Sequence, residues 1–407
     1  MKRYMSSIIL VCVSIIIIGA YYGKMMVSAN NFPEYSIKTL EGREGEIKDV
    51  TLSGFVEKDG RTNSVKITSN ETLYQSEQSY LQRLTGNNDP KIEKLKKEHR
   101  SFMRGQGNIH SFYQDSDFIA YAEADYKSSS IDHSYKHAFN IGLLDLASDK
   151  DISFEMSVPG EIFNHISVLD VQLIQSKLKV VTKNYIYTNT DVDDVEVHVY
   201  TFDLGNQKLL NDEVIITPQQ IKMGYDVLDS MGLNPQRPRN SIVFIKRPEV
   251  VNQSEESASN TDKAAILEYV YEKNHLETIE LPETLETRIV TSQNYLIGDK
   301  LYIINQDAKG MHVTTFNITN QSITNDQTFP INNNNWGGAF PIVIKNDRVY
   351  VLATNDFEKD NTTNMPPQLF IAELKTGGIL YKGEVIPKKA DKKINTKPLV
   401  LHSLEIN

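Results

Sequence analysis

Short runs of β-branched and aromatic residues recur along the chain, each led in by polar residues. This composition favours β-strands. Val195, Val197 and Val199 also alternate with polar or aromatic neighbours, as in a strand with one buried face. The runs with a polar lead-in are Asp117–Tyr121, Ser176–Val181, Asn240–Phe244, Asp299–Ile303 and Asp347–Val351. The pattern therefore predicts a mainly β chain.

A second element follows each run: an apolar–polar–aliphatic step that leads into a turn. Its copies are Leu144–Ser148, Phe202–Asn206, Phe316–Asn320 and Ala372–Thr376, with a weaker copy at Val270–Asn274. Asp145, Asp203, Asn317 and Glu373 hold equivalent places just before their turns. Because four copies share this position, we interpret these side chains as hairpin chemistry and not as catalytic groups.

Together the two elements read as strand, hairpin, strand, so each repeat predicts an antiparallel meander of three or four strands. Repetition of such a unit is typical of repeat architectures. We expect an all-β fold, a β-propeller of six to eight blades. Residues 46–74 could supply one more blade, and residues 398–406 a closing strand. Stacked β-sandwiches are the alternative.

One region interrupts the β pattern. Asp89-Pro90 is a typical helix start, and Gly105 a natural stop. Between them, apolar positions recur at three- and four-residue steps: Ile92, Leu95, His99, Phe102 and Met103. Residues 76–84, ended by Gly86, could form a preceding short helix. We therefore predict a helical insertion at 76–104.

The N-terminus predicts a membrane segment. Lys2 and Arg3 precede seventeen uncharged residues, 6–22, and the apolar stretch reaches Val27 if Lys24 extends to the interface. Basic residues before the span would keep the N-terminus cytoplasmic. We expect residues 1–29 to be a cytoplasmic tip and single-pass anchor, and residues 30–407 an extracytoplasmic domain. The alternative is a signal peptide cleaved near Ala29.

Composition narrows the class of protein. The net charge of −10 leaves no overall footprint for nucleic acid. The one cysteine, Cys12, falls inside the apolar stretch, so the exported part has no disulfide. A domain of this size can bury enough apolar surface without one.

The predicted helix is basic, with six basic residues against two acidic ones between positions 91 and 104, a net +4. This charge could form a docking face for an acidic partner or an anionic membrane surface. An ordinary solvated face over a packed apolar stripe is the alternative. The candidate partner-binding residues here are Lys94, Lys97, Arg100 and Phe102. Trp336, in an Asn-rich and Gly-rich loop, is a further candidate, or a plug between two blades.

Two clusters of side chains contain residue types that can bind a metal ion. Asp191, Asp193, Asp194 and Glu196 cluster in one acidic hairpin, which could suit calcium, but they lack the spacing and glycine of an EF-hand. His133 and His137 lie four apart, but the lead-in Ser128-Ser129-Ser130 indicates a loop and no glutamate follows the first histidine. We expect neither a metal nor another cofactor.

No nucleophile elbow, phosphate loop or His-Glu-x-x-His motif is present, so no catalytic residue is assigned. The alternation of Leu-Tyr-Ile strands with Phe-Asp-Leu-Gly-Asn turns, behind an anchor, resembles membrane-anchored extracytoplasmic β-propeller-like repeat proteins of Firmicutes. The resemblance covers about residues 110–390. Because the chain reads as exported, anchored and repetitive and carries no catalytic signature, we expect an envelope binding or regulatory module. It would contact another envelope or membrane protein and could modulate a sensor kinase or envelope assembly. The alternative is an envelope hydrolase that acts on a glycan or ester at the central mouth of the propeller.

Overall fold

The computed structural model describes residues 10–21, 23, 32–58, 60–78, 90–128, 135–160, 163–186, 194–221, 226–231, 237–248, 263–307, 310–331, 341–354, 366–388 and 399–406. Residues 10–21 are helical. Among the described residues, no helix is both long enough and apolar enough to cross a membrane.

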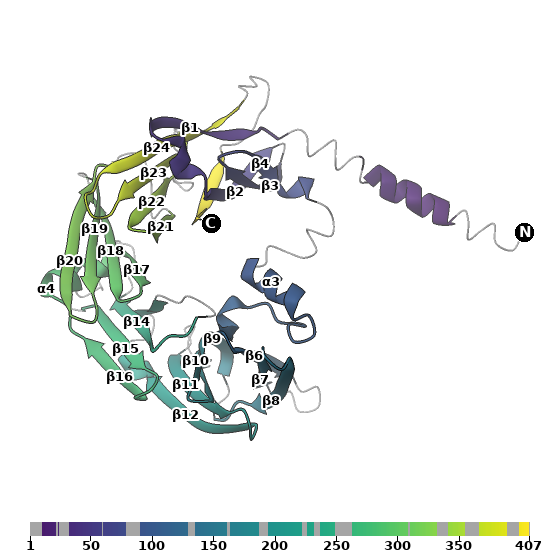
Figure 1. Ribbon diagram of the computed structural model, residues 1–407, viewed down its shortest axis with the longest axis vertical. Coiled ribbons are helices and arrows are strands. Elements are labelled where there is room, and N and C mark those ends of the chain that lie inside the picture. The colour runs from purple at the N-terminus through teal and green to yellow at the C-terminus, as the bar shows by residue number, and fades with distance from the viewer. Residues whose placement is uncertain are drawn as a thin grey trace, which may run out of the picture. The chain divides into compact units, whose positions relative to one another are not determined.

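The rest of the described chain is dominated by six antiparallel sheets (Figure 1). The chain divides into two compact units: unit 1 holds residues 1–87, 306–313 and 325–407, and unit 2 holds residues 88–305 and 314–324. The all-β prediction is confirmed at this level. Each sheet contains a meander of strands consecutive in the sequence, as the repeats predicted.

Three four-stranded sheets lie in unit 2. The first joins β5 (Phe112–Gln114), β6 (Phe118–Ser128), β7 (Tyr135–Asp145) and β8 (Lys150–Ser157). The second joins β9 (Phe163–Ile174), β10 (Lys177–Ile186), β11 (Asp194–Asp203) and β12 (Lys208–Ile216). The third joins β13 (Asp226–Met231), β14 (Ser241–Pro248), β15 (Ala265–Val270) and β16 (His275–Ile279).

A fourth sheet joins β17 (Gln293–Ile297), β18 (Lys300–Asp307), β19 (Gly310–Asn317) and β20 (Ser322–Phe329). Short helices lie between some of the strands in the sequence. They are α3 (Pro90–Glu98), α4 (Glu283–Glu286) and α5 (Arg288–Thr291), with the 3-10 turns η1 (Glu44–Ile47), η2 (Gln75–Glu77), η3 (Ile109–Ser111) and η4 (Pro218–Gln220).

The repeated sequence elements form the second and third strands of five sheets. In four copies, the first residue of the turn donates its backbone N–H to the carbonyl of the polar lead-in residue. Leu146 donates to Asp117 at 2.8 Å, and Tyr271, Ile318 and Leu374 donate to Asn240, Asp299 and Asp347, each at 2.9 Å. The bond ties the third strand's end to the second strand's start. The lead-in and the turn therefore recur together because they bond to each other.

The turn after the third strand needs a left-handed residue. Gly377 supplies it in one copy with φ of 73°. The other copies use non-glycine residues there: Asp149, Gln207, Asn274 and Gln321, with φ between 47° and 53°. Asn and Asp tolerate this region better than glutamine does. In three of these copies the side chain before the turn, that of Asp145, Asp203 or Asn317, accepts backbone N–H bonds inside the turn.

Unit 1 contains the last two sheets, and each includes a strand from the opposite end of the chain. β1 (Tyr35–Gly42) pairs with β24 (Ile379–Pro387), outside β21 (Ile342–Lys345), β22 (Arg348–Ala353) and β23 (Gln368–Glu373). β25 (Val400–Ile406) pairs with β2 (Val50–Lys58), followed by β3 (Arg61–Thr68) and β4 (Thr72–Tyr74). Each of these two sheets therefore joins strands from opposite ends of the chain, an arrangement called here the exchange of the chain ends. A strand does form within residues 398–406, as the sequence predicted.

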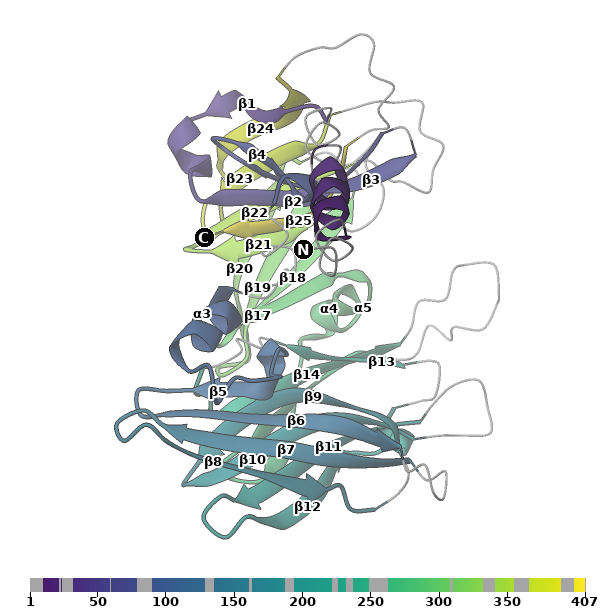
Figure 2. The same ribbon diagram turned by 90° about the vertical axis from the view of Figure 1, so that its right-hand side faces the viewer.

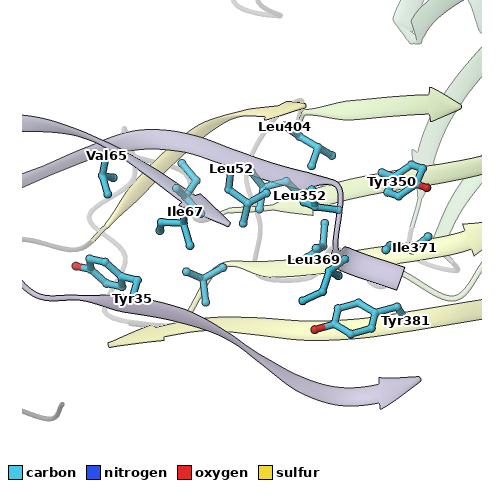
Figure 3. Close-up of a cluster of buried hydrophobic side chains, with 14 of the residues drawn as sticks. Tyr35, Leu52, Val65, Ile67, Tyr350, Leu352, Leu369, Ile371, Tyr381 and Leu404 are labelled. Atoms are coloured by element: carbon cyan, nitrogen blue, oxygen red, sulfur yellow. The ribbon is translucent and has the colours of Figure 1, made fainter. Parts of the chain in front are cut away.

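An apolar core lies between these two sheets (Figure 3). Leu52, Ile67, Leu352 and Leu369 are fully buried in it, and Leu404 from β25 joins them. Strands from both chain ends therefore bury side chains in one cluster. Burial of each such side chain contributes about 1.5–3 kcal/mol, which favours the exchanged arrangement.

The helical insertion is shorter than predicted. The α-helix starts at Pro90 but ends at Glu98, and residues 99–105 continue as a bend and turns. Residues 75–77 form only the 3-10 turn η2, and residues 79–84 lie outside the described residues. The predicted stripe still packs inward because His99 and Met103 continue the helical bonding, with Met103 N–H donating to the His99 carbonyl at 2.9 Å.

Candidate functional site: a charged cleft beside α3

Helix α3 packs its apolar side on the edge of the β5–β8 sheet (Figure 2). Ile92 and Leu95 are buried against residues of β5, β6 and β7, including Phe112 and Ile119. The apolar spacing therefore lets the helix pack on the sheet, and the proline at its first position suits the first helical turn.

Phe102 belongs to the same core. It is 7% exposed, and its ring centroid lies 5.0 Å from that of Tyr121. This places Phe102 inside unit 2 and not on a docking surface, because the turn after Glu98 folds back onto the sheet. Lys94, Lys97 and Arg100 are exposed, as a docking face requires.

A cleft of about 370 Å³ opens beside α3. Its lining comes from three segments of unit 2. Those residues are Lys91, Lys94, Leu95 and Glu98 of α3, Gln114 and Asp115 at the β5–β6 turn, and Arg237 before β14. This volume falls in the range of small-ligand pockets. Of the predicted residues, only Lys94 lies in it.

The Asp115 carboxylate serves the turn that carries it. Oδ1 accepts the backbone N–H groups of Asp117 at 2.8 Å and Phe118 at 2.7 Å, and Oδ2 accepts the Tyr113 hydroxyl at 2.6 Å. Burial raises the pKa of Asp115, but these bonds outweigh it and leave the pKa below its ordinary value. Asp115 therefore stays ionised, and much of its hydrogen-bonding capacity is used internally.

Arg237 is positioned by a buried glutamine. Gln172 of β9 is 1% exposed; its Nε2 donates to the Arg237 carbonyl at 3.2 Å, and its Oε1 accepts the Arg239 backbone N–H at 3.0 Å. The side-chain amide thus holds the segment before β14 as a neighbouring strand would. Among the described residues, none forms an ion pair with the Arg237 side chain.

A buried polar group secures this anchor. Asp170, 4% exposed, accepts the Tyr271 hydroxyl at 2.6 Å and lies 3.4 Å from Arg239 Nε. Gln172 Nε2 also donates to Asp170 Oδ1 at 3.2 Å. Burial raises the pKa of Asp170, and Arg239 and Tyr271 oppose that shift. The network joins the second and third sheets. It also holds Gln172, the residue that donates to the Arg237 carbonyl.

The charge balance of the lining is positive. Lys91, Lys94 and Arg237 face Glu98 and Asp115, and Lys94 Nζ lies a loose 3.9 Å from Glu98 Oε1. Three cations against two carboxylates, one of them already hydrogen-bonded by its own turn, suit an anionic group. Guanidinium and ammonium groups together bind carboxylates well.

Sequence reasoning missed Arg237 and Asp115. Asp115 looks like any turn aspartate, and Arg237 lies more than 120 residues from the α3 lysines in the sequence. Only the packing of α3 and the Gln172 anchor bring the three segments together. No local signal in the sequence marks that meeting.

The other candidate residues from the sequence do not line this cleft. Trp336, Asp191, Asp193 and His133 lie outside the described residues. His137 is buried in β7, and its Nε2 lies 2.9 Å from the Phe163 carbonyl. Within the described part of the chain, no group of three His, Cys, Asp or Glu side chains could hold a metal ion.

The hairpin acids do what their repetition predicted. Asp145 Oδ1 accepts the N–H groups of Ala147 and Ser148, both at 2.9 Å, and Asp203 Oδ1 accepts that of Asn206 at 2.9 Å. In the equivalent turns, Asn317 Oδ1 accepts the Asn320 N–H, and Glu373 Oε2 accepts the Thr376 hydroxyl. These four side chains are therefore structural.

Comparison with protein-family models finds no match, and no curated protein matches the chain. Solved structures do match. A prolyl endopeptidase is 12% identical, with a TM-score of 0.37, over 85% of this chain and 52% of its own. The β-propeller domain of the Trilobed protease from Pyrococcus furiosus is 10% identical, with a TM-score of 0.29, over 88% and 86%.

A polysaccharide lyase is 12% identical, with a TM-score of 0.34, over 68% of this chain and 57% of its own. The chain spans about half the length of the prolyl endopeptidase. Similarities at this level concern the β architecture, and they assign no residue of the cleft a role.

Proposed function

We propose that this protein is a binding module of the cell envelope that captures an acidic segment of another envelope protein in the cleft beside α3. The observation that carries the proposal is the joint lining of that cleft by Lys94 and Arg237. These cations come from separate segments, and Gln172 fixes the backbone of the second. Such preorganisation lowers the cost of binding an anion.

The shape of the site favours a protein segment over a membrane surface. Lys97 and Arg100 are exposed on the α3 side, whereas Lys94 and Arg237 line a concave space. A flat bilayer can contact the exposed cations but cannot enter the cleft. An extended acidic chain can place one carboxylate in the cleft and others along the exposed cations.

Two expectations from the sequence complete the proposal. The six sheets serve as blades of a β-propeller, and the N-terminal segment tethers the module outside the membrane. Fractionation of cells that express the full chain, followed by protease treatment of intact cells, tests the tether. Recovery of the intact chain in the culture medium or the cytosol would contradict it.

The cleft is tested with the full chain and a labelled oligoglutamate peptide. We expect saturable binding, and we expect Lys94→Glu with Arg237→Glu to weaken it by about tenfold or more, because two attractive charges become repulsive. Lys66→Glu with Lys375→Glu, at two exposed positions of unit 1, is the charge-matched control and should bind as the wild type does. Equal affinities for all three proteins would refute the assignment.

A photo-crosslinker at Lys97 then identifies the occupant in cells. A specific protein adduct that the Lys94/Arg237 double variant loses supports the proposal. Adducts with lipid alone, or none, contradict it. Vesicles with anionic lipid provide the matched comparison in vitro, and we expect them to bind more weakly than the peptide at physiological salt.

A hydrolase is the second candidate, because two carboxylates, Glu98 and Asp115, line the same cleft. Glycoside hydrolysis uses such a pair. The bonds that keep Asp115 ionised exclude it as the acid, which leaves Glu98 for that role. Turnover of a glycan or ester that Glu98→Gln abolishes would establish this activity, and a full substrate panel without turnover would exclude it.

A further inference from the structure

A second charged pocket, of about 320 Å³, lies in unit 1 where the chain ends are exchanged. Four segments line it. They are Gly45, Glu46, Lys48, Asp49 and Val50 around η1, Lys345, Asn346 and Arg348 at the β21–β22 hairpin, Tyr350 of β22, and Ile406 at the end of β25. It shares no residue with the cleft beside α3, so it is an independent site.

The hairpin presents two of its cations together. Asn346 and Asp347 have φ of 53° and 56°, the left-handed pair of a two-residue hairpin turn. Lys345 and Arg348 flank this turn as a directly opposed strand pair. Opposed residues project on the same face of a sheet, so both cations line the same pocket.

The two carboxylates that line the pocket, those of Glu46 and Asp49, are partly neutralised by neighbouring cations. Glu46 is 10% exposed and lies between two arginines: its Oε1 is 3.4 Å from Arg43 Nη2, and its Oε2 accepts a short bond from Arg348. Lys48 and Asp49 are only loosely paired, at 3.9 Å, and both are exposed. A guanidinium has five N–H donors, so its bond to one carboxylate leaves it able to bind a second anion.

We propose that this pocket binds a small multivalent oxyanion, a phosphate or polycarboxylate, and that binding strengthens the exchange of the chain ends. Lys48 and Arg348 supply the charge, and the Tyr350 hydroxyl lies beside the guanidinium. Lys345 Nζ donates to the Ile406 carbonyl at 2.9 Å, which ties the pocket to β25. An anion held by η1 and the β21–β22 hairpin would resist separation of β25 from β2.

The experiment measures binding of inorganic phosphate and of citrate to the full chain by calorimetry, at constant ionic strength with chloride as reference. We expect saturable binding of at least one of them. Arg348→Gln should weaken it by about tenfold, because a charge-assisted donor is lost. Lys48→Gln, an exposed position whose substitution preserves the fold, should weaken it about twofold to fivefold. Lys375→Gln, at an exposed position outside both pockets, should have no effect.

Hydrogen exchange distinguishes a built site from an adventitious ion. At about ten times the dissociation constant, the amides of residues 401–406 should exchange roughly tenfold more slowly, whereas those of β11 should not change. The proposal fails if neither anion binds above the chloride background, if Lys48→Gln and Arg348→Gln bind as the wild type does, or if β25 exchange is unaffected. Lys48→Gln leaves the ion pairs of Glu46 with Arg43 and Arg348 in place. It therefore tests anion binding even if Arg348→Gln unfolds the chain.

Discussion

His198 Nδ1 lies 2.7 Å from Asp212 Oδ1, while Nε2 of the same ring lies 3.0 Å from Glu196 Oε2. A neutral imidazole has one N–H, so two carboxylate partners are satisfied only by the imidazolium. Burial lowers the pKa of His198, but the hydrogen bonds to Asp212 and Glu196 outweigh it and raise the pKa above its ordinary value. Two further aromatic rings lie against it, Tyr200 stacked and Phe163 edge-on.

The stability of unit 2 should therefore depend on pH through His198. Its raised folded pKa contributes stability that is fully present below the unfolded value of about 6.5 and is lost as pH rises through the folded pKa. Urea unfolding at a series of pH values should show the wild type losing its advantage over His198→Gln as pH increases. His275→Gln, at an exposed position, is the control. A pH-independent difference would contradict the assignment of the imidazolium.

The exchange of chain ends should depend on Gly54. A Cβ at this position would lie 1.9 Å from the Val400 carbonyl oxygen, at the register shift where β2 pairs with β25. Gly54→Ala should therefore force the strands apart and lower the free energy of unfolding by about 1–3 kcal/mol, the usual cost of overpacking. Gly45→Ala has no heavy atom within 4 Å of the added carbon and provides the control. Equal unfolding midpoints for the two variants would rule out this role.

The repeated turns predict opposite effects of two glycine substitutions. Gln207 has φ of 52°, so Gln207→Gly should relieve strain and leave stability unchanged or raise it by up to about 1 kcal/mol. Gly377 holds the same place with φ of 73°, and Gly377→Ala should lower stability by about 1–2 kcal/mol. Thermal unfolding of both variants measures the two signs. Destabilisation by Gln207→Gly would show that its side chain has a role beyond the turn.

Periodicity predicted the β content, the meanders and the turn side chains because each depends on neighbours in the sequence. Leu374 and Asp347, for example, belong to one repeat and bond within it. The addition of β1 to β24 was not predicted. Lys38 and Glu384 are partners in that pairing, but they are separated by nearly the whole chain, and the strand sequence carries no mark of its partner.

The candidate site was predicted only in part for the same reason. Helical spacing identified α3, and its basic face placed Lys94 correctly at an exposed position. The same spacing should have assigned Phe102 to the core, because it belongs to the apolar stripe with Ile92 and Leu95. Arg237 could not be found, since its position depends on a side-chain anchor in another sheet.

That anchor yields the most direct test of the cleft. Gln172→Met removes the bonds to the Arg237 carbonyl and the Arg239 N–H without removing any cation. We expect weaker binding of oligoglutamate, because Arg237 loses its fixed position, and a loss of about 1–3 kcal/mol in stability from unsatisfied buried groups.

A control must separate positioning from general destabilisation. Asn184→Leu removes an equally buried amide that donates to the Tyr200 hydroxyl at 3.0 Å, in the same sheet but outside the cleft. It should lower stability by a similar amount and leave peptide affinity unchanged. Both affinities are measured well below the unfolding temperatures. If the two variants lose affinity in proportion to their stability, Gln172 has only a structural role; if Gln172→Met alone loses it, the buried amide positions Arg237 for the ligand.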